Sequence, residues 1–300
     1  MNNQENGNEV SQVGRRAGQS VGGAINFFIG FPRLRVRKPG AWLICALATI
    51  CLLVGVSVKA QSTAATQPAG TAALMYTAVA RDGNSCEWRS TNFDYDANGQ
   101  RVAHVHSYTE LGSGLNHLVN GKWIPSVETV DLLPDGTAAG TNCPHQVFFP
   151  IDISQGVITV ITPDGQSIES RPSLLCYVDG TNSATLAILK SSVGELVASN
   201  QVLYADAFDG IQADVLFTYT KAGLEQDIVL HQQPVLPESI GFNSQTVRLE
   251  MFTEFAGEKE PELIPGIIDP ENNLQDTVLK FGAMSMIMGR AFSTDAQQTD

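Results

Sequence analysis

Residues Asp214–Leu230, DVLFTYTKAGLEQDIVL, decide the fold class of this chain. Two short runs that contain β-branched and aromatic side chains flank Ala222-Gly223, and neither run shows the spacing of a helix. Within Leu224–Leu230 the side chains alternate between two faces, and Leu224 and Ile228 fall on the same one. The stretch therefore predicts a β-hairpin with a tight turn.

The same pattern continues on both sides of this stretch. Gly156–Thr162 and Gln166–Ser170 flank a Pro-Asp-Gly turn and predict a second hairpin, and Ala184–Lys190 with Glu195–Leu203 predict a third. Seven Asx-Gly pairs, which tolerate the positive φ of tight turns, punctuate the region: Asp82-Gly83, Asn98-Gly99, Asn120-Gly121, Asp135-Gly136, Asp164-Gly165, Asp179-Gly180 and Asp209-Gly210.

These signals predict that residues 73–300 are all-β, an antiparallel β-sandwich-type domain. Two packed sandwiches, divided near residue 180, are an alternative. We expect residues 256–277 to form an acidic surface loop.

An apolar segment precedes this region. Residues 41–58, AWLICALATICLLVGVSV, carry no charge and follow the cationic run RLRVRK at residues 33–38. Eighteen helical residues reach about 27 Å, close to the roughly 30 Å of a bilayer core. We therefore predict a signal or transmembrane helix at residues 41–60, with the cationic side in the cytoplasm. Cleavage after Ala60 and an uncleaved single-pass anchor both stay open.

This helix divides the chain into a stub and an exported part. Residues 1–40 are predicted to be a disordered, basic, cytosolic stub, residues 61–72 a flexible spacer, and residues 73–300 an extracytoplasmic region of a bacterial envelope, secreted or anchored. Residues 1–60 carry a net charge of +5 and the other 240 residues a net charge of −18. Because an acidic body repels phosphate, we expect no nucleic-acid partner.

Three cysteines lie in the exported part: Cys86, Cys143 and Cys176. An oxidising compartment permits disulfides, but the odd number leaves at least one thiol unpaired. The sequence does not choose among the three pairings, and we expect none to be structural because a domain of this size has a core of its own.

Residues 94–99, DYDANG, match the first half of a calcium loop, in which alternating oxygens converge on the ion. The ligands would be the side chains of Asp94, Asp96 and Asn98 and the backbone carbonyl of Gln100. Val105 stands where the bidentate acid of the motif belongs. The favoured interpretation is an Asn-Gly hairpin with solvated acids, and no other cofactor is indicated.

Two weaker patterns involve histidine. His104 and His106 fall on one face of a predicted strand and could ligate zinc, with His117 or His145 as a third ligand. Cys143-Pro144-His145 contains a nucleophile and a base, but sequence neighbours seldom adopt the required geometry. We predict no catalytic residues.

The chain resembles a known family. Residues 213–230, together with Asn120–Trp123, Leu133–Gly136, His145–Phe149 and Thr162–Gln166, are similar to the β-rich region that precedes the repeats in large bacterial YD-repeat (Rhs-type, wall-associated) proteins. The resemblance implies a secreted or surface-displayed polypeptide and supplies no active-site residues. Tandem YD repeats are missing from this chain.

Two functions from different classes follow. The first is a non-enzymatic extracytoplasmic β-domain for display or interaction, with an extracellular protein or glycan as an unidentified partner. The alternative is a carbohydrate-binding or carbohydrate-active sandwich, which calcium could support. Solvent-exposed Trp88 and Trp123 would favour sugar stacking, whereas we expect both to be buried.

Overall fold

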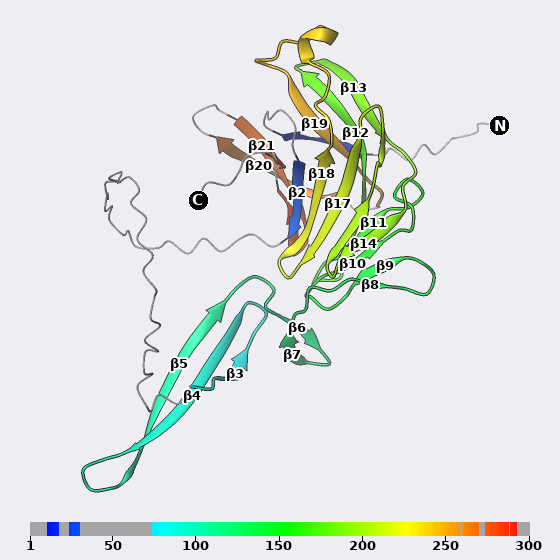
Figure 1. The fold of residues 1–300 in the computed structure, drawn as a ribbon. Coiled ribbons are helices and arrows are strands. Elements are labelled where there is room, and N and C mark those ends of the chain that lie inside the picture. Colours follow the sequence, from blue (N-terminus) through cyan, green and yellow to red (C-terminus); the bar gives the residue numbers. More distant parts are fainter. Residues whose placement is uncertain are drawn as a thin grey trace, which may run out of the picture.

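The structure, a computed structural model, describes residues 11–17, 24–30, 74–257, 260–269, 274–287 and 289–292. These residues form an all-β fold of antiparallel sheets, which confirms the predicted fold class. Their only helical element is the 3-10 turn η1 (Pro237–Ile240). Two large sheets form the body, and a smaller sheet projects from it (Figure 1).

The first large sheet lies around one long central strand. Its order is β1 (Ser11–Ala17), β19 (Arg248–Phe255), β12 (Ser167–Asp179), β11 (Ile158–Ile161), β10 (Gln146–Phe149), β9 (Ala138–Gly140) and β8 (Asp131–Leu132). In addition, β13 (Asn182–Leu189) pairs with β12, and β16 (Phe208–Asp209) pairs with β13. β11 pairs with the first part of β12, and β13 pairs with its second part. The long strand β12 therefore connects both ends of the sheet.

The second large sheet contains the stretch that the sequence singles out. Its order is β14 (Gly194–Ala198), β15 (Gln201–Tyr204), β17 (Ala213–Thr220), β18 (Gly223–Leu230), β2 (Ala24–Gly30), β22 (Met284–Met286), β21 (Leu274–Phe281) and β20 (Glu262–Asp269), and β23 (Arg290–Phe292) also pairs with β2.

Two of the three predicted hairpins are confirmed, namely β11–β12 and β17–β18. The predicted pairing of residues 184–190 with residues 195–203 is wrong, because β13 and β14 belong to different sheets. The turn at Gly180, with φ 61°, folds β13 back on β12. The chain then crosses between the sheets, where Ser192 Oγ donates to the carbonyl of Ala205. The predicted loop at residues 256–277 is also wrong in part, since β20 and the start of β21 are strands.

The two large sheets bury one continuous core. The Phe149 ring of the first sheet lies 5.7 Å from the Phe217 ring of the second. A single cluster of buried apolar side chains extends from Val130 to Met286. A division near residue 180 would therefore fall at the turn between two paired strands of one sheet, and residues on both sides of it contribute to the same core.

Part of the predicted N-terminal stub is described as strand. β1 pairs with β19, and β2 pairs with β18, where disorder was expected. Each pairing satisfies backbone groups along a strand edge that would otherwise stay open. The rest of the stub, the apolar segment 41–58 and the spacer 61–72 lie outside the described residues. In the part of the chain that is described, no helix is long and apolar enough to span a membrane.

The smaller sheet consists of β3 (Thr77–Arg81), β4 (Ser85–Tyr95) and β5 (Arg101–Leu111), and we name it the arm. Figure 1 shows the arm as a long twisted hairpin that points away from the two large sheets. A short hairpin of β6 (Asn116–Val119) and β7 (Lys122–Pro125) connects the arm to β8.

Candidate interaction surface on the arm

A buried asparagine fixes the base of the arm. Asn116 has no exposed surface, and its Nδ2 donates to the carbonyls of Asp82 and Ser85, at 2.7 and 3.0 Å. Its Oδ1 accepts from Arg81 Nη1 at 2.8 Å. Three hydrogen bonds to one side chain therefore hold the turn that joins β3 to β4. A buried amide with all of these partners is well satisfied, which favours one orientation of the arm.

A close backbone approach attaches this base to the body. Gly114 has φ +67°, and a Cβ atom there would collide with the carbonyl oxygen of Lys221 in the β17–β18 turn. The backbone N–H of Lys221 in turn donates to Glu128 Oε1 at 2.8 Å. Glycine is needed at position 114 both for its backbone conformation and for this contact. The arm is thus fixed where it leaves the body.

Beyond its base the arm is a two-stranded hairpin. β4 and β5 pair without a register shift from Ser85↔Leu111 to Tyr95↔Arg101, whereas β3 reaches only as far as Arg89 on β4. Every residue of β5 is exposed. Isolated two-stranded hairpins are marginally stable in water, and sheets normally bury at least one face. A hairpin of this length with both faces exposed is typical of a contact surface.

One face of the hairpin is apolar. Phe93, Tyr95 and Val105 share it and are 48%, 73% and 60% exposed. The guanidinium of Arg101 lies 3.6 Å from the centroid of the Phe93 ring. Such stacking shields part of the ring, while the tyrosine and valine side chains stay open to solvent.

The opposite face carries an aromatic strip. The rings of Trp88 and Tyr108 lie nearly parallel, with centroids 6.3 Å apart, and Tyr76 packs edge-on against Tyr108 at 5.0 Å. The Trp88 indole N–H donates to Glu110 Oε2 at 2.9 Å. Trp88 is half-buried, and Trp123 on β7 is 40% exposed, so the expectation that both tryptophans are buried is wrong. A neighbouring layer that would cover them is absent on the described arm.

The residues of the predicted calcium loop form the tip of the arm. Asp96 Oδ1 accepts from the backbone N–H groups of Asn98 and Gln100, both at 2.8 Å, and Asp94 Oδ1 lies 3.0 Å from His104 Nε2. One carboxylate therefore caps an Asn-Gly turn, and the other pairs with a histidine. Calcium binding stays a prediction at these residues.

The two histidines of β5 lie on the same face, as predicted. His106 Nε2 lies 2.9 Å from Asn92 Oδ1, so each imidazole contacts a side chain of β4. Neither candidate third ligand joins them, because His117 lies on β6 and His145 is buried in the body. Within the described residues, no group of three His, Cys, Asp or Glu side chains converges on one point.

Cys143 and His145 are both buried, and their surroundings suit packing in the core. Burial raises the pKa of the Cys143 thiol and lowers the pKa of His145 to about 4. The thiol donates to the carbonyl of Val127 at 3.6 Å, and the His145 ring packs edge-on against Tyr219 at 5.1 Å. A nucleophilic cysteine needs a lowered pKa and a base that accepts its proton, so these shifts oppose nucleophilic activation. The three described cysteines, Cys86, Cys143 and Cys176, are free and buried.

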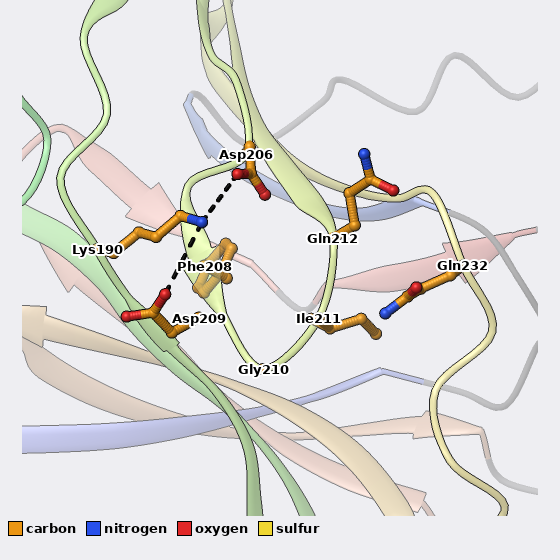
Figure 2. A pocket seen from close by; sticks show the side chains of 8 residues that line it. All are labelled: Lys190, Asp206, Phe208, Asp209, Gly210, Ile211, Gln212 and Gln232. Atoms are coloured by element: carbon orange, nitrogen blue, oxygen red, sulfur yellow. Dashed lines mark hydrogen bonds and ion pairs between the residues drawn. The ribbon is translucent and has the colours of Figure 1, made fainter.

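A shallow depression on the body offers a second candidate site (Figure 2). Its only cation, Lys190, donates to Asp206 Oδ2 at 2.8 Å and lies 3.8 Å from Asp209 Oδ1. The hydrogen bond to Asp206 raises the pKa of Lys190, so this ammonium is held in its charged form by two carboxylates. Gln212 and Gln232 complete the wall. A charged lysine that is paired with two carboxylates beside two amides can hold a polar ligand but supplies no nucleophile–base pair.

The sequence contains the residues of the arm but gives no sign of its exposure. β5 reads RVAHVHSYTEL, an alternation that is typical of a strand with one buried face. β5 lacks lysine and proline, but β4, which is equally long, lacks them too, so their absence does not distinguish the exposed strand. Comparison of the chain with protein-family models, with curated proteins and with solved structures finds no match.

Proposed function

We propose that this chain is a non-enzymatic extracytoplasmic β-domain that is displayed for interaction and contacts its partner through the arm. One observation carries the proposal: Asn116 of the β6–β7 hairpin bonds to the base of the arm and Gly114 lies close against the β17–β18 turn of the body, whereas all of β5 and the distal half of β4 are exposed. A rigidly attached surface with exposed apolar side chains loses little conformational entropy on binding. The chemistry of the sites described above supports no catalytic role.

The extracytoplasmic location is supported by the sequence. The uncharged segment 41–58 follows a cationic run, and the following 240-residue portion from residue 61 is acidic. The resemblance to the N-terminal β-region of YD-repeat proteins points to the same location. In this proposal the membrane is a partner through residues 41–58 only.

Labelling of intact cells tests display directly. The variant Asn98→Cys places a thiol at the exposed tip of the arm, while Cys86, Cys143 and Cys176 are buried. We expect a membrane-impermeant maleimide to label this variant well above the wild-type chain in intact cells. Labelling that appears only after lysis would overturn the proposal, as would saturable turnover of a glycan or peptide that one carboxylate substitution abolishes.

Carbohydrate binding is a second candidate, and the aromatic strip favours it. Tyr108 is 50% exposed beside the half-buried Trp88, and their nearly parallel rings offer a flat surface on which a sugar ring can stack. Titration of neutral oligosaccharides against residues 61–300 should then give a signal that Tyr108→Ala removes and Tyr95→Ala, on the opposite face, retains. No heat or fluorescence change with any oligosaccharide excludes this candidate.

The calcium version of this candidate has its own test. One calcium site at 100-fold excess over its Kd stabilises a domain by about 2.7 kcal/mol. Melting of residues 61–300 with calcium and with chelator should therefore differ, and Asp96→Asn should remove the difference. An unchanged melting temperature rules out a calcium site at Asp94, Asp96, Asn98 and Gln100.

A further inference from the structure

The outer edge of β5 is open and unprotected. Along Arg101–Leu111 the strand pairs with β4 on one side, and no other described strand pairs with it. Its register is continuous, it contains no proline or lysine, and its only formal charges are Arg101 and Glu110 near its ends. Exposed edges in soluble proteins normally carry lysine, proline, a bulge or very few residues, because an open edge pairs readily with another strand.

Several other edges described in this molecule show those protective features. β8 and β16 are two residues long, and β14 and β3 have register shifts in their pairing. β20 contains Pro265 and a register shift as well. β1, an edge of the first large sheet, has a continuous register but only seven residues, two of which are Arg15 and Arg16. β5 is therefore the longest described edge that lacks a register shift, a proline and a lysine.

The chemistry of β5 suits pairing with an identical strand. Residues 103–109 carry no formal charge and include valine, tyrosine and threonine, which favour strands. In an antiparallel pair centred on His106, Arg101 of one copy lies opposite Leu111 of the other, and Glu110 lies opposite Val102. No like charges face each other in this arrangement, so the pairing carries no charge penalty.

The distribution of charge favours the same partner. Residues 74–125, which contain the arm, carry four basic and five acidic side chains, a net charge of −1, whereas residues 126–300 carry seven and 24, a net charge of −17. Two copies that meet through their bodies would repel each other strongly. The arm points away from the body (Figure 1), so two arms can meet while the bodies remain apart.

We propose that β5 pairs edge to edge with β5 of a second copy, antiparallel and around a two-fold axis, so that two arms form one six-stranded sheet. This inference rests on the proposed function in that it takes the arm as the contact surface, and it names the partner. Main-chain hydrogen bonds along the two strands supply the affinity. The two-fold axis makes the contact closed, so association stops at the dimer.

The size of this contact sets its strength. Two strands and the side chains beside them bury less than the roughly 1,200–2,000 Å² of a stable complex. We therefore expect a reversible dimer whose fraction rises with protein concentration. Sedimentation velocity of the full chain over a hundredfold concentration range measures it, and a monomer at every concentration overturns the proposal.

Two matched substitutions locate the contact. Val105 on β5 and Thr91 on β4 are cross-strand neighbours on one face, and both are exposed. In this register Val105 lies opposite Ser107 of the other copy, so Val105→Lys places the two ammonium groups diagonally across the pair. It should weaken the dimer about fivefold or more, whereas Thr91→Lys should leave it unchanged. Equal effects of both substitutions, or an effect of Thr91→Lys alone, contradict pairing through β5.

A cross-link tests the register. His106→Cys puts two thiols opposite each other at the two-fold axis, within the Cα separation that a disulfide requires. Under mild oxidation we expect a covalent dimer from His106→Cys and little from Asn98→Cys at the tip. The reverse result rejects this register. Failure of display is seen separately: an Asn98→Cys chain that dimerises in solution but stays unlabelled in intact cells contradicts export and leaves the β5 pairing intact.

Discussion

Asn116 shows how much of the arm depends on one side chain. It lies at the start of β6, has no exposed surface and bonds to Arg81 and to two carbonyls of the β3–β4 turn. Removing such a side chain leaves a guanidinium and two carbonyls without their partner. Nothing in the sequence around it, LNHLVNG, distinguishes this asparagine from Asn120, four residues later. Its role depends on contacts with residues 31 to 35 positions away in the chain.

We predict that Asn116→Ala lowers the free energy of unfolding by about 1–3 kcal/mol. The loss should appear in urea denaturation of residues 61–300 and in faster hydrogen exchange of β3 and β4. Asn92→Ala is a matched control, because Asn92 is exposed and its Oδ1 contacts His106 on the neighbouring strand. An equal loss in both variants would show that the position of Asn116 has no special role.

His145 determines a pH dependence. Burial lowers its pKa from 6.5 to about 4, so between these values the unfolded chain binds a proton that the folded chain does not. Stability is therefore fully present above about pH 6.5 and falls as the pH drops toward 4. The difference corresponds to about 3 kcal/mol. His145→Gln should flatten this part of the profile in urea titrations, while the exposed His104→Gln should not; identical slopes in all three proteins contradict the assignment.

The aspartates of several turns affect stability in a different pH range from His145. Hydrogen bonds lower the pKa of Asp82, Asp135, Asp152 and Asp164. The main donors are the backbone of Asn84 and the side chains of Thr137, Ser191 and Thr162, respectively. A carboxyl whose pKa is lowered in the folded state stabilises the fold fully above its ordinary pKa near 3.8. This stabilisation is lost as the pH falls through the lowered pKa. This contribution is therefore intact across the range in which His145 acts.

At the scale of elements, local turn chemistry predicts hairpins but not their partners. The Pro-Asp-Gly turn at residues 163–165 and the Gly223 turn were both identified, because each residue type suits one backbone geometry. The wrong prediction of a hairpin at residues 184–203 has a different cause. Whether β13 folds back on β12 or forward onto β14 depends on which pairing buries Ala187 against the core, and that contact is long-range.

The candidate surface shows the same limit. The sequence predicts a hairpin at Asn98-Gly99 and a strand that carries His104 and His106, but it cannot show that no other layer covers them. The exposure of Trp123 follows from its place in the two-stranded β6–β7 hairpin, which has no third strand in the described part of the chain. Whether a strand is covered depends on how the sheets assemble, so the residue pattern of a single strand does not show it.

We predict that the arm and the body exchange backbone hydrogens at very different rates. The distal hairpin has no buried core, whereas β17 alternates between buried and half-buried residues along its whole length. Amides of residues 90–106 should therefore exchange through local opening, and those of β17 through global unfolding. Hydrogen-exchange mass spectrometry of residues 61–300 measures both, and equal protection would mean that something covers the arm. Protection of β5 that grows with concentration would mark the proposed dimer.

At the scale of the whole molecule, the proposed export conflicts with the position of two described strands. β1 and β2 pair with β19 and β18 of the body. If residues 41–58 cross the membrane, or if the chain is cleaved after Ala60, residues 11–30 are separated from the body. One molecule cannot satisfy both arrangements.

A peptide added in trans decides between them. Under the export proposal, residues 61–300 fold cooperatively alone, and a synthetic peptide of residues 11–30 leaves their melting temperature unchanged. A saturable rise in melting temperature would instead show that β1 and β2 belong to the fold, and would contradict export by this route. A reporter that is active only in the cytosol, fused after Asp300, gives an independent answer in cells: activity there also contradicts export.

The length of β5 has an electrostatic consequence. Eleven residues at about 3.4 Å each carry the tip of the hairpin roughly 35 Å from its base. The Debye length at physiological ionic strength is about 8 Å, so the tip stands some four screening lengths away from the field of the acidic body. The charges that a neighbour meets at the tip are therefore those of the arm itself, Asp94, Asp96 and Arg101, and not the excess negative charge of the body.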